Sequence, residues 1–369
     1  MHVRSLSLEQ FRSYERAEVR FGPALTVLEG RNAAGKTNLL EALWLLSGAR
    51  SLRASRDDQV VRTGAPSARL VGAFTAGQRA RELVLFIERG PTTRKRWRLQ
   101  RAPATRSPPW QENFRACCFG LTTSTSSRAP AATAAPTSTS SWCGVRVAQA
   151  ALVRRVEQVL AQRRAALELL QQGGSADLAS LDEQLVQEGA ALGAIRRALV
   201  GALAPVVHAV HAAVAGSATH VDLALTNPAD PGGTAQTAAA LAASYRAALA
   251  ELHAQEVASG RNLVGPQRDD LSISIGGRLL RDFGSRGEWR TAVVALKLAE
   301  LEHLARVRTE RPVLLLDDVL SELDQPRRRA LEAWLTKQQT ILATTDRHEL
   351  SGTLLADATV LTGGGPRAT

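Results

Sequence analysis

Eight consecutive residues near the N-terminus have the types and spacing of a phosphate-binding loop. They read G-x-x-x-x-G-K-T and are Gly30, Arg31, Asn32, Ala33, Ala34, Gly35, Lys36 and Thr37. The two glycines let the backbone wrap a polyphosphate so that several N–H groups point at its oxygens. Lys36 would place a positive charge on the β- and γ-phosphates, and the Thr37 hydroxyl would ligate Mg²⁺.

Two adjacent carboxylates late in the chain could supply the rest of a hydrolytic site. Asp317 and Asp318 follow an apolar run over residues 312–316, which is typical of a buried parallel strand. This is a Walker B pattern. Asp317 would hold the Mg²⁺ of the nucleotide, and Asp318 would act as general base on the attacking water. A buried strand capped by two surface acids is the structural alternative.

The elements around the loop are those that a phosphate site needs. Residues 24–28 form a short β-prone run that leads into the loop, and residues 38–46 have helical character. A helix that starts at Asn38 would bring its N-terminus to the phosphates. Further strands are expected over residues 3–8, 17–21, 69–74, 82–87 and 340–343, because apolar residues alternate or cluster there.

The long stretch between the two motifs is mainly helical in character. Helices are expected over residues 150–172, 178–203 and 234–256, and another over 291–306. Gly189, Gly193 and Gly201 weaken the second of them. Helices of this length suit a short antiparallel arm and not a long coiled coil. The sequence therefore predicts an α/β core with an inserted, mainly helical lobe.

Composition narrows the class of partner. The chain has 46 Lys and Arg against 35 Asp and Glu, a formal net charge of +11, which favours a polyanionic partner such as nucleic acid. A GC-rich gene rich in arginine codons is the alternative explanation. No apolar run approaches the roughly 20 residues of a membrane span, and the three cysteines make neither a disulfide framework nor a metal site. A cytoplasmic protein without a membrane partner is expected.

Residues 101–146 differ from the rest of the chain. Ser, Thr, Ala and Pro dominate residues 122–141, and no acidic residue occurs between Glu112 and Glu157. A natural linker is one interpretation. Our preferred hypothesis is a pair of compensating frameshifts or sequencing errors, because out-of-frame reading of a GC-rich gene gives such text. Resequencing this part of the gene tests the hypothesis.

Four features of the sequence, one of which is the phosphate-binding loop, resemble the ABC-type ATPase heads of the SMC family, and more specifically the RecF family. The opening segment over residues 6–14, the loop over 30–37, the segment over 265–271 and the block over 285–324 carry the resemblance. In that block, Ser285, Arg286, Gly287 and Glu288 look like the family's signature motif. Ser321 and Asp324 look like its D-loop. The implied fold is a P-loop ABC-type ATPase head with a mixed sheet, helices and a helical lobe.

The resemblance implies that the site is completed by a second copy of the chain. Ser285 would contact the γ-phosphate that the other subunit binds, and Asp324 would belong to the same contact across the subunits. ATP would lie between two subunits, so the homodimer would depend on ATP and Mg²⁺.

The resemblance also implies a role in DNA repair, recombination, replication and the SOS response. The chain would be a slow, DNA-stimulated ATPase that clamps double-stranded DNA or ss/ds junctions. It would act with RecR in the RecO pathway to load a recombinase. Arg154, Arg155, Arg163 and Arg164 in the helical lobe are candidate DNA contacts, although a solvated helix face explains them equally well.

Three alternatives remain open at this point. An ABC transporter subunit would carry a switch histidine after the last strand, where Thr344 or Thr345 stands here. An SMC-like structural tether would need longer arms. An inactive nucleotide-binding scaffold is disfavoured by Lys36, Asp317 and Asp318.

Two departures from the family pattern bear on the domain organisation. Gln267 occupies a position that is usually His, and no acceptable Q-loop match exists over residues 115–145. The expected divisions are residues 1–100 for the first part of the ATPase core, 101–146 for the abnormal segment and 147–260 for the helical lobe. Residues 261–369 would complete the core with the signature, Walker B and D-loop motifs.

Overall fold

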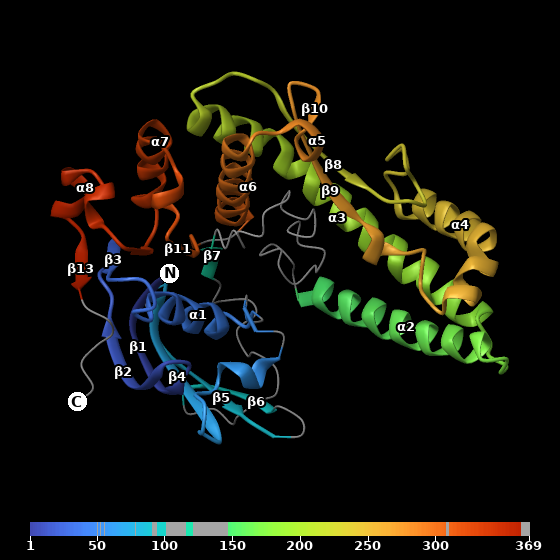
Figure 1. Ribbon diagram of the computed structural model, residues 1–369, viewed down its shortest axis with the longest axis horizontal. Helices are drawn as coiled ribbons and strands as arrows, with labels where there is room; N and C mark the ends of the chain where they lie inside the picture. Colours follow the sequence, from blue (N-terminus) through green and yellow to red (C-terminus); the bar gives the residue numbers. More distant parts are fainter. Residues whose placement is uncertain are drawn as a thin grey trace. The chain divides into compact units, whose positions relative to one another are not determined.

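The structure is a computed structural model (Figure 1). It describes residues 1–49, 51, 53–54, 56–77, 79–90, 94–100, 116–120, 147–307 and 310–362, with side chains omitted at 116–120, 147–150 and 322. The chain divides into two compact units. Unit 1 contains residues 1–123, 213–216 and 297–369, and unit 2 contains residues 124–212 and 217–296. Each is described by itself.

Unit 1 contains an antiparallel sheet with the strand order β2-β1-β4-β5-β6. Its strands are β1 (His2–Phe11), β2 (Tyr14–Arg20), β4 (Ser67–Ala76), β5 (Arg79–Glu88) and β6 (Arg94–Leu99). Burial alternates most clearly along β4, as the period of two requires when one face is packed and the other is open. Leu6, Leu8, Leu70 and Leu85, for example, are fully buried. The strands expected over residues 3–8, 69–74 and 82–87 are confirmed with longer bounds, and the one expected over 17–21 begins earlier, at Tyr14, and ends at Arg20.

The second sheet of unit 1 is parallel and has the order β13-β3-β12-β11-β7. Its strands are β3 (Leu25–Glu29), β7 (Ala116–Gly120), β11 (Val313–Asp317), β12 (Thr340–Thr344) and β13 (Thr359–Thr362). Runs of Val, Leu and Ile make β3, β11 and β12 buried on both faces, as is typical of parallel sheets, whereas β13 is only partly buried. The expected strands at 24–28, 312–316 and 340–343 are confirmed.

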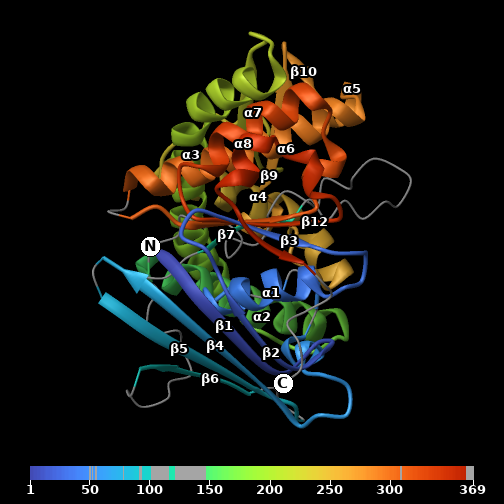
Figure 2. The same cartoon turned by 90° about the vertical axis from the view of Figure 1, so that its left-hand side faces the viewer.

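Helix α1 (Lys36–Leu46) lies between the two sheets and forms the centre of the core. Figure 2 shows this layering, with the antiparallel sheet on one side of α1 and the parallel sheet on the other. The helix can be covered on both sides because every residue from Leu39 to Leu46 is buried. The other helical segments of unit 1 are η1 (Asp57–Val60), η5 (Leu320–Glu322), α7 (Gln325–Leu335), η6 (Arg347–Glu349) and α8 (Gly352–Ala356).

Unit 2 is built mainly from long helices. They are α2 (Val147–Gln171), α3 (Ala179–Ala215) and α4 (Ala238–Ser259), with the small antiparallel sheet β8 (Val221–Thr226), β9 (Asp270–Ile275) and β10 (Arg278–Leu279). Shorter segments are η4 (Pro266–Arg268) and α5 (Leu280–Phe283), and α6 (Arg286–Val307) runs from unit 2 into unit 1. Figure 1 shows α2, α3 and α4 side by side.

Helix α3 is longer than its sequence predicted. The expected end at Leu203 is wrong, because the helix continues through Pro205 to Ala215. Pro205 leaves the carbonyl of Gly201 without its helical N–H partner, but both residues are exposed, so water can solvate that carbonyl. Gly189 and Gly193 do not interrupt the helix either. Both lie where neighbouring side chains pack closely against the helix: a Cβ at Gly189 would lie 3.0 Å from Pro266 Cδ.

The length of α3 also changes one conclusion about membranes. Within the described residues, α3 alone is long and apolar enough to cross a bilayer by length and composition. The expectation that no apolar run approaches that length is therefore wrong on this test. The helix is rich in alanine, valine and leucine, and 39% of its most apolar window is buried inside the protein.

The division into units differs from the expected domain boundaries after residue 260. Residues 261–296 belong to unit 2, whereas sequence reasoning assigned them to the ATPase core. The cause is strand pairing: β9 pairs with β8 over the register Val221↔Ile275 to Thr226↔Asp270. That pairing ties residues 270–275 to the helical unit.

Candidate active site

The glycine-rich loop connects the carboxyl end of β3 to the N-terminus of α1. Gly35 precedes the helix with φ of 93°, and no side chain caps the helix N-terminus. The first N–H groups of α1 are thus available to an anion, which the helix dipole also favours. Gly35 tolerates this conformation because it lacks a Cβ, and a Cβ there would lie 2.3 Å from the Tyr14 hydroxyl oxygen.

Lys36 and Asn38 fix the shape of the loop. The Lys36 ammonium group donates to the carbonyl oxygens of Gly30 and Arg31, the latter at 3.0 Å. The Gly30 N–H donates to the Thr344 carbonyl at 3.3 Å, which joins the loop to the end of β12. The Asn38 amide donates to the Ser13 hydroxyl at 2.9 Å. These contacts hold the loop against the end of β12 and the turn at Ser13.

The two carboxylates predicted at the end of β11 lie beside this loop. The Thr37 hydroxyl donates to Asp317 Oδ1 at 3.0 Å. Burial raises the pKa of Asp317, the hydrogen bond from Thr37 opposes that effect, and the neighbouring charge of Asp318 adds to it. The structure thus brings together Thr37 and Asp317, which are far apart in the sequence.

Asp318 has an unusual backbone and an unsatisfied side chain. Its φ is 51°, its N–H donates to the Ala343 carbonyl at 2.9 Å, and its Oδ1 is buried without a hydrogen-bond partner among the described residues. Unpaired buried oxygens are uncommon and frequently mark a functional site. Hard oxygen donors on Thr37 and Asp317 form a pair suited to Mg²⁺.

Sequence reasoning missed the side chains that support the loop. The Tyr14 hydroxyl is buried without a hydrogen-bond partner among the described residues, and burial raises the pKa of Tyr14 to about 12. Arg12 forms two hydrogen bonds with buried Glu41, at 2.8 and 2.7 Å. The signal for the second contact was Glu41 itself, an acid within the otherwise apolar helix α1.

The signature segment lies in unit 2 and begins α6. The expected start of this helix at Thr291 is wrong, because Arg286, Gly287 and Glu288 already belong to its first turn. Glu288 Oε2 accepts hydrogen bonds from the Ser285 N–H and hydroxyl, both at 2.8 Å, and Ser285 Oγ accepts from the Glu288 N–H at 3.2 Å. This is a capping box, which explains the earlier start.

The predicted D-loop residues have local contacts in unit 1. The Ser321 hydroxyl donates to the Asp318 carbonyl at 2.9 Å. Asp324 caps α7, where it accepts from the Arg327 N–H at 3.1 Å and its guanidinium at 2.5 Å. Ser321 is therefore joined directly to the segment that carries the two carboxylates.

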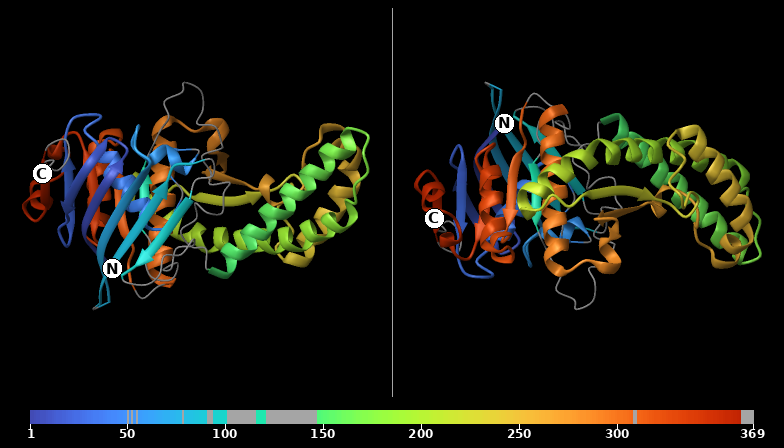
Figure 3. Two further views of the ribbon diagram at one scale, coloured as in Figure 1. Left: turned by 90° about the horizontal axis from the view of Figure 1, so that it is seen from below. Right: turned by 90° about the horizontal axis from the view of Figure 1, so that it is seen from above.

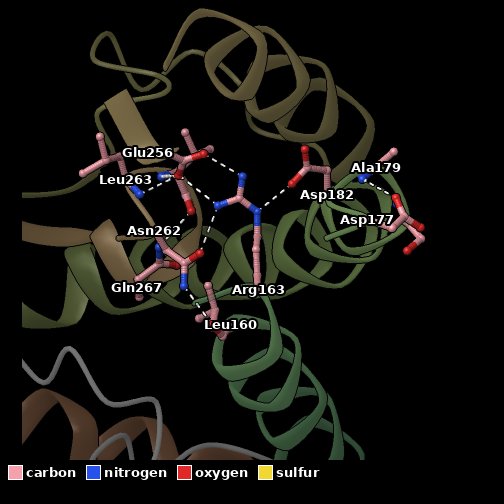
Figure 4. Close-up of polar contacts among 11 residues, drawn as sticks. Leu160, Arg163, Asp177, Ala179, Asp182, Glu256, Asn262, Leu263 and Gln267 are labelled. Carbon is pink, nitrogen blue, oxygen red and sulfur yellow. Dashed lines mark hydrogen bonds and ion pairs between the residues drawn. The ribbon is translucent and has the colours of Figure 1, made fainter. Parts of the chain in front are cut away.

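The suggested role as a DNA contact is wrong for one of the four arginines. Arg163 is fully buried, and it binds Asp182 and Glu256 inside unit 2 (Figure 4). Arg155 and Arg164 are exposed but paired with Glu188 and Glu168. Arg154 is exposed. The expected Q-loop and most of the abnormal segment over 101–146 lie outside the described residues, which include only the backbone of β7 from that region.

Comparisons with known proteins agree on one family. Residues 2–354 match the family described as the RecF/RecN/SMC N terminal domain. The DNA replication and repair protein RecF of Herpetosiphon aurantiacus is 35% identical to this chain over 97% of both proteins. The protein of the same name from Geobacter sulfurreducens is 31% identical over 94% of this chain and 93% of its own length.

Solved structures agree on the fold. A structure of the recombination mediator protein RecF-ATPrS in the RecFOR pathway has a TM-score of 0.82 and 23% identity, covering 95% of this chain and 94% of that one. An SMC head bound to the C-winged helix domain of ScpA has a TM-score of 0.50 at 16% identity, covering 99% of this chain and 96% of that one. The fold is that of an α/β ABC-type ATPase head, as predicted, and the chain belongs to the RecF family.

Proposed function

We propose that this chain is an ATP-dependent DNA-binding protein of recombinational repair and replication-gap processing. In this proposal, two copies close as a clamp on double-stranded DNA or ss/ds junctions when ATP is bound, and slow hydrolysis releases them. The observation that carries the proposal is the contact of Thr37 with Asp317 beside an uncapped helix N-terminus. Membership of the RecF family supports the DNA repair role.

The nucleotide would be held by the loop and the start of α1. The loop and helix start over residues 30–38 would surround the phosphates, with the N–H groups of Lys36 and Thr37 at the helix N-terminus pointing at them, and the Lys36 ammonium would exchange its loop carbonyls for phosphate oxygens. Thr37 and Asp317 would hold Mg²⁺, which would neutralise phosphate charge. Asp318, whose buried oxygen lacks a partner among the described residues, would accept the proton of the attacking water.

The second copy would complete the site through its signature and D-loop residues. The Ser285 N–H and hydroxyl both donate to Glu288, so they already form an acceptor-binding pair at the start of α6. A γ-phosphate from the other subunit would replace the Glu288 carboxylate as their acceptor. Arg286 and Gly287, in the same turn, and Ser321 and Asp324 of the D-loop would line that contact.

The remaining finer functions follow the family. DNA would stimulate the ATPase activity of the chain. The chain would act in the cytoplasm with RecR in the RecO pathway, and it would promote recombinase loading. The solved structures of the recombination mediator protein RecF-ATPrS and RecF-ATP in the RecFOR pathway share the fold of this chain, and this likeness supports the proposal.

Sedimentation of the purified chain tests the proposal. The samples contain no nucleotide, ADP or ATP with Mg²⁺, each with and without a DNA duplex. A dimer that forms with ATP and is strengthened by DNA is expected. Ser285→Arg should abolish that dimer while ATP still binds, and Arg329→Ala serves as an exposed control in unit 1. A chain that stays monomeric while it binds ATP would refute the clamp.

A further inference from the structure

The outer face of the antiparallel sheet in unit 1 is open. Alternate residues of each strand point away from α1, and no helix of unit 1 covers that face in Figure 3, left. The register places these outward residues side by side: Arg69 opposite Phe86, Val71 opposite Val84, and Arg98 opposite Val84 on the next strand. These outward residues of β4, β5 and β6 therefore lie side by side in one layer.

A groove at one end of this sheet is lined with arginine, and both faces of the sheet contribute to it, since Arg81 stands opposite the buried Phe74. It has a volume of about 550 Å³ and is bordered by Arg4, Arg81 and Arg98, with Glu82 as its acid and Gln100 as a neutral polar residue. The three arginines come from β1, β5 and the neighbouring β6. Three guanidinium groups against one carboxylate give the groove a positive charge.

These three arginines are unpaired, unlike others on the same sheet. Among the described residues, Arg4, Arg81 and Arg98 form no ion pair, and Arg98 Nε is buried without a hydrogen-bond partner. On the same face, Arg69 pairs with Glu9 at 3.2 Å and Arg96 pairs with Glu88. Arginines left without carboxylates around a groove are available to an external anion, for which guanidinium geometry is well suited.

An aromatic ring extends the basic surface. The guanidinium carbons of Arg69 and Arg98 lie 5.9 and 6.0 Å from the centre of the Phe86 ring. Such contacts hold guanidinium groups in place without neutralising their charge. Arg98 therefore faces the groove from a fixed position rather than as a freely moving surface chain.

We propose that this groove binds the phosphodiester backbone of nucleic acid. The three arginines stand on three different strands of one hydrogen-bonded sheet, so the backbone holds their positions around the groove. Nucleic acid is favoured over an acidic protein segment because the chain as a whole carries a net charge of +11, which attracts long polyanions. This inference rests on the proposed DNA function and assigns part of the contact to named residues.

Fluorescence anisotropy with labelled DNA tests the groove. A 30-base duplex and the corresponding single strand are titrated over a range of salt concentrations with ATP and Mg²⁺. Three variants are compared with the wild type: a triple Arg→Gln change at positions 4, 81 and 98, the same triple change to Lys, and a charge-matched triple Arg→Gln control at positions 261, 278 and 329. The control arginines are exposed and, among the described residues, have no ion pairs.

The expected result is a weaker salt dependence of DNA binding in the triple Arg→Gln variant. Loss of three phosphate contacts should reduce the slope of log K against log salt by about 2.7 for duplex and about 2.1 for single strand. At 0.1 M salt this corresponds to a loss of affinity on the order of 10²-fold. The Lys variant should keep the wild-type slope because it keeps the charges. A loss on one form of DNA only would identify which form the groove holds.

Other outcomes overturn the inference. If the wild type binds DNA and the groove variant loses no more affinity than the control, the groove is not a DNA contact, although the proposed function stands. If the wild type itself binds no DNA, the proposed function and the groove fail together. ATP binding and thermal unfolding of each variant show that unit 1 is intact, and a Lys variant that behaves like the Gln variant would also contradict a charge-based contact.

Discussion

Replacement of Arg163 by methionine should strongly destabilise unit 2. The side chains of Arg163 and Glu256 are fully buried, and Figure 4 shows the guanidinium between Glu256 and Asp182. Arg163 donates to Glu256 at 3.0 and 2.6 Å, to Asp182 at 2.6 Å and to Asn262 at 2.9 Å. Burial lowers the pKa of Arg163, but hydrogen bonds and charges of the two acids outweigh burial and raise it overall.

The size of the destabilisation follows from the buried groups that remain after the substitution. Arg163→Met removes the cation and leaves the Glu256 carboxylate buried, with only the N–H groups of Leu263 and Val264 as donors, at 2.6 and 3.3 Å. Breaking one side of a buried pair costs about 3–5 kcal/mol of unfolding free energy. Adding Glu256→Gln removes the uncompensated charge, so the double variant should recover about 1–3 kcal/mol of that loss.

Urea unfolding followed by circular dichroism measures these changes in a double-mutant cycle. Arg246→Met is the matched control, because Arg246 makes a similar two-bond contact with Glu183, at 3.2 and 2.7 Å, on the exposed surface. It should leave the free energy of unfolding unchanged. If Arg163→Met unfolds at the same urea concentration as that control, or if the two changes at Arg163 and Glu256 simply add, the cluster does not stabilise unit 2 as argued.

Three further predictions concern the candidate site and the helices. Asp317→Asn should stabilise the metal-free protein at pH 7. The pKa of Asp317 is raised in the folded state, so the wild type loses its more stable protonated form as pH rises through that pKa, whereas the neutral asparagine does not titrate. Urea unfolding should show this gain vanishing below the ordinary aspartate pKa, and an equal gain at all pH values would contradict it. Gly35→Ala should abolish ATP binding measured by calorimetry, because φ at Gly35 is 93° and a Cβ there meets Tyr14; unchanged affinity would refute the packing argument. Gly201→Ala should raise thermal stability by about 0.5–1 kcal/mol, since nothing lies within 4 Å of the added Cβ, while Gly189→Ala should give no such gain because Pro266 lies 3.0 Å away; equal gains at both sites would show that the contact at Gly189 is unimportant.

Sequence patterns predicted the local structure of the site well because its signals are local. The residue types of Gly35 and Lys36 directly predict the turn of the loop and its positive charge. The apolar run before Asp317 is typical of a buried strand. The antiparallel sheet was similarly visible in alternating residues. The family resemblance then supplied the fold class, which the comparisons confirm.

The errors arose where distant residues decide the outcome. Arg163 looks like any arginine on a polar helix face, and only the placement of Glu256 from α4 reveals that it is buried. Gly189 looks like a helix breaker until Pro266 and Tyr245 are placed against it. The start of α6 could have been found locally, since Ser285 and Glu288 have the spacing of a capping box. The contact of Tyr14 with Gly35 had no sequence signal.

The order of strands in the parallel sheet has a consequence for synthesis of the chain. β3, which leads into the glycine-rich loop, has β12 and β13 as its neighbours, and both belong to the last thirty residues or so before Thr369. At roughly 5–20 residues per second, a ribosome needs on the order of 15–60 seconds to make those partners after β3 emerges. Until then β3 and its loop have no completed sheet, whereas β8 and β9 of unit 2 meet within fifty residues or so. During synthesis, the pairing of β8 with β9 in unit 2 therefore becomes possible before the sheet that carries the glycine-rich loop can be completed.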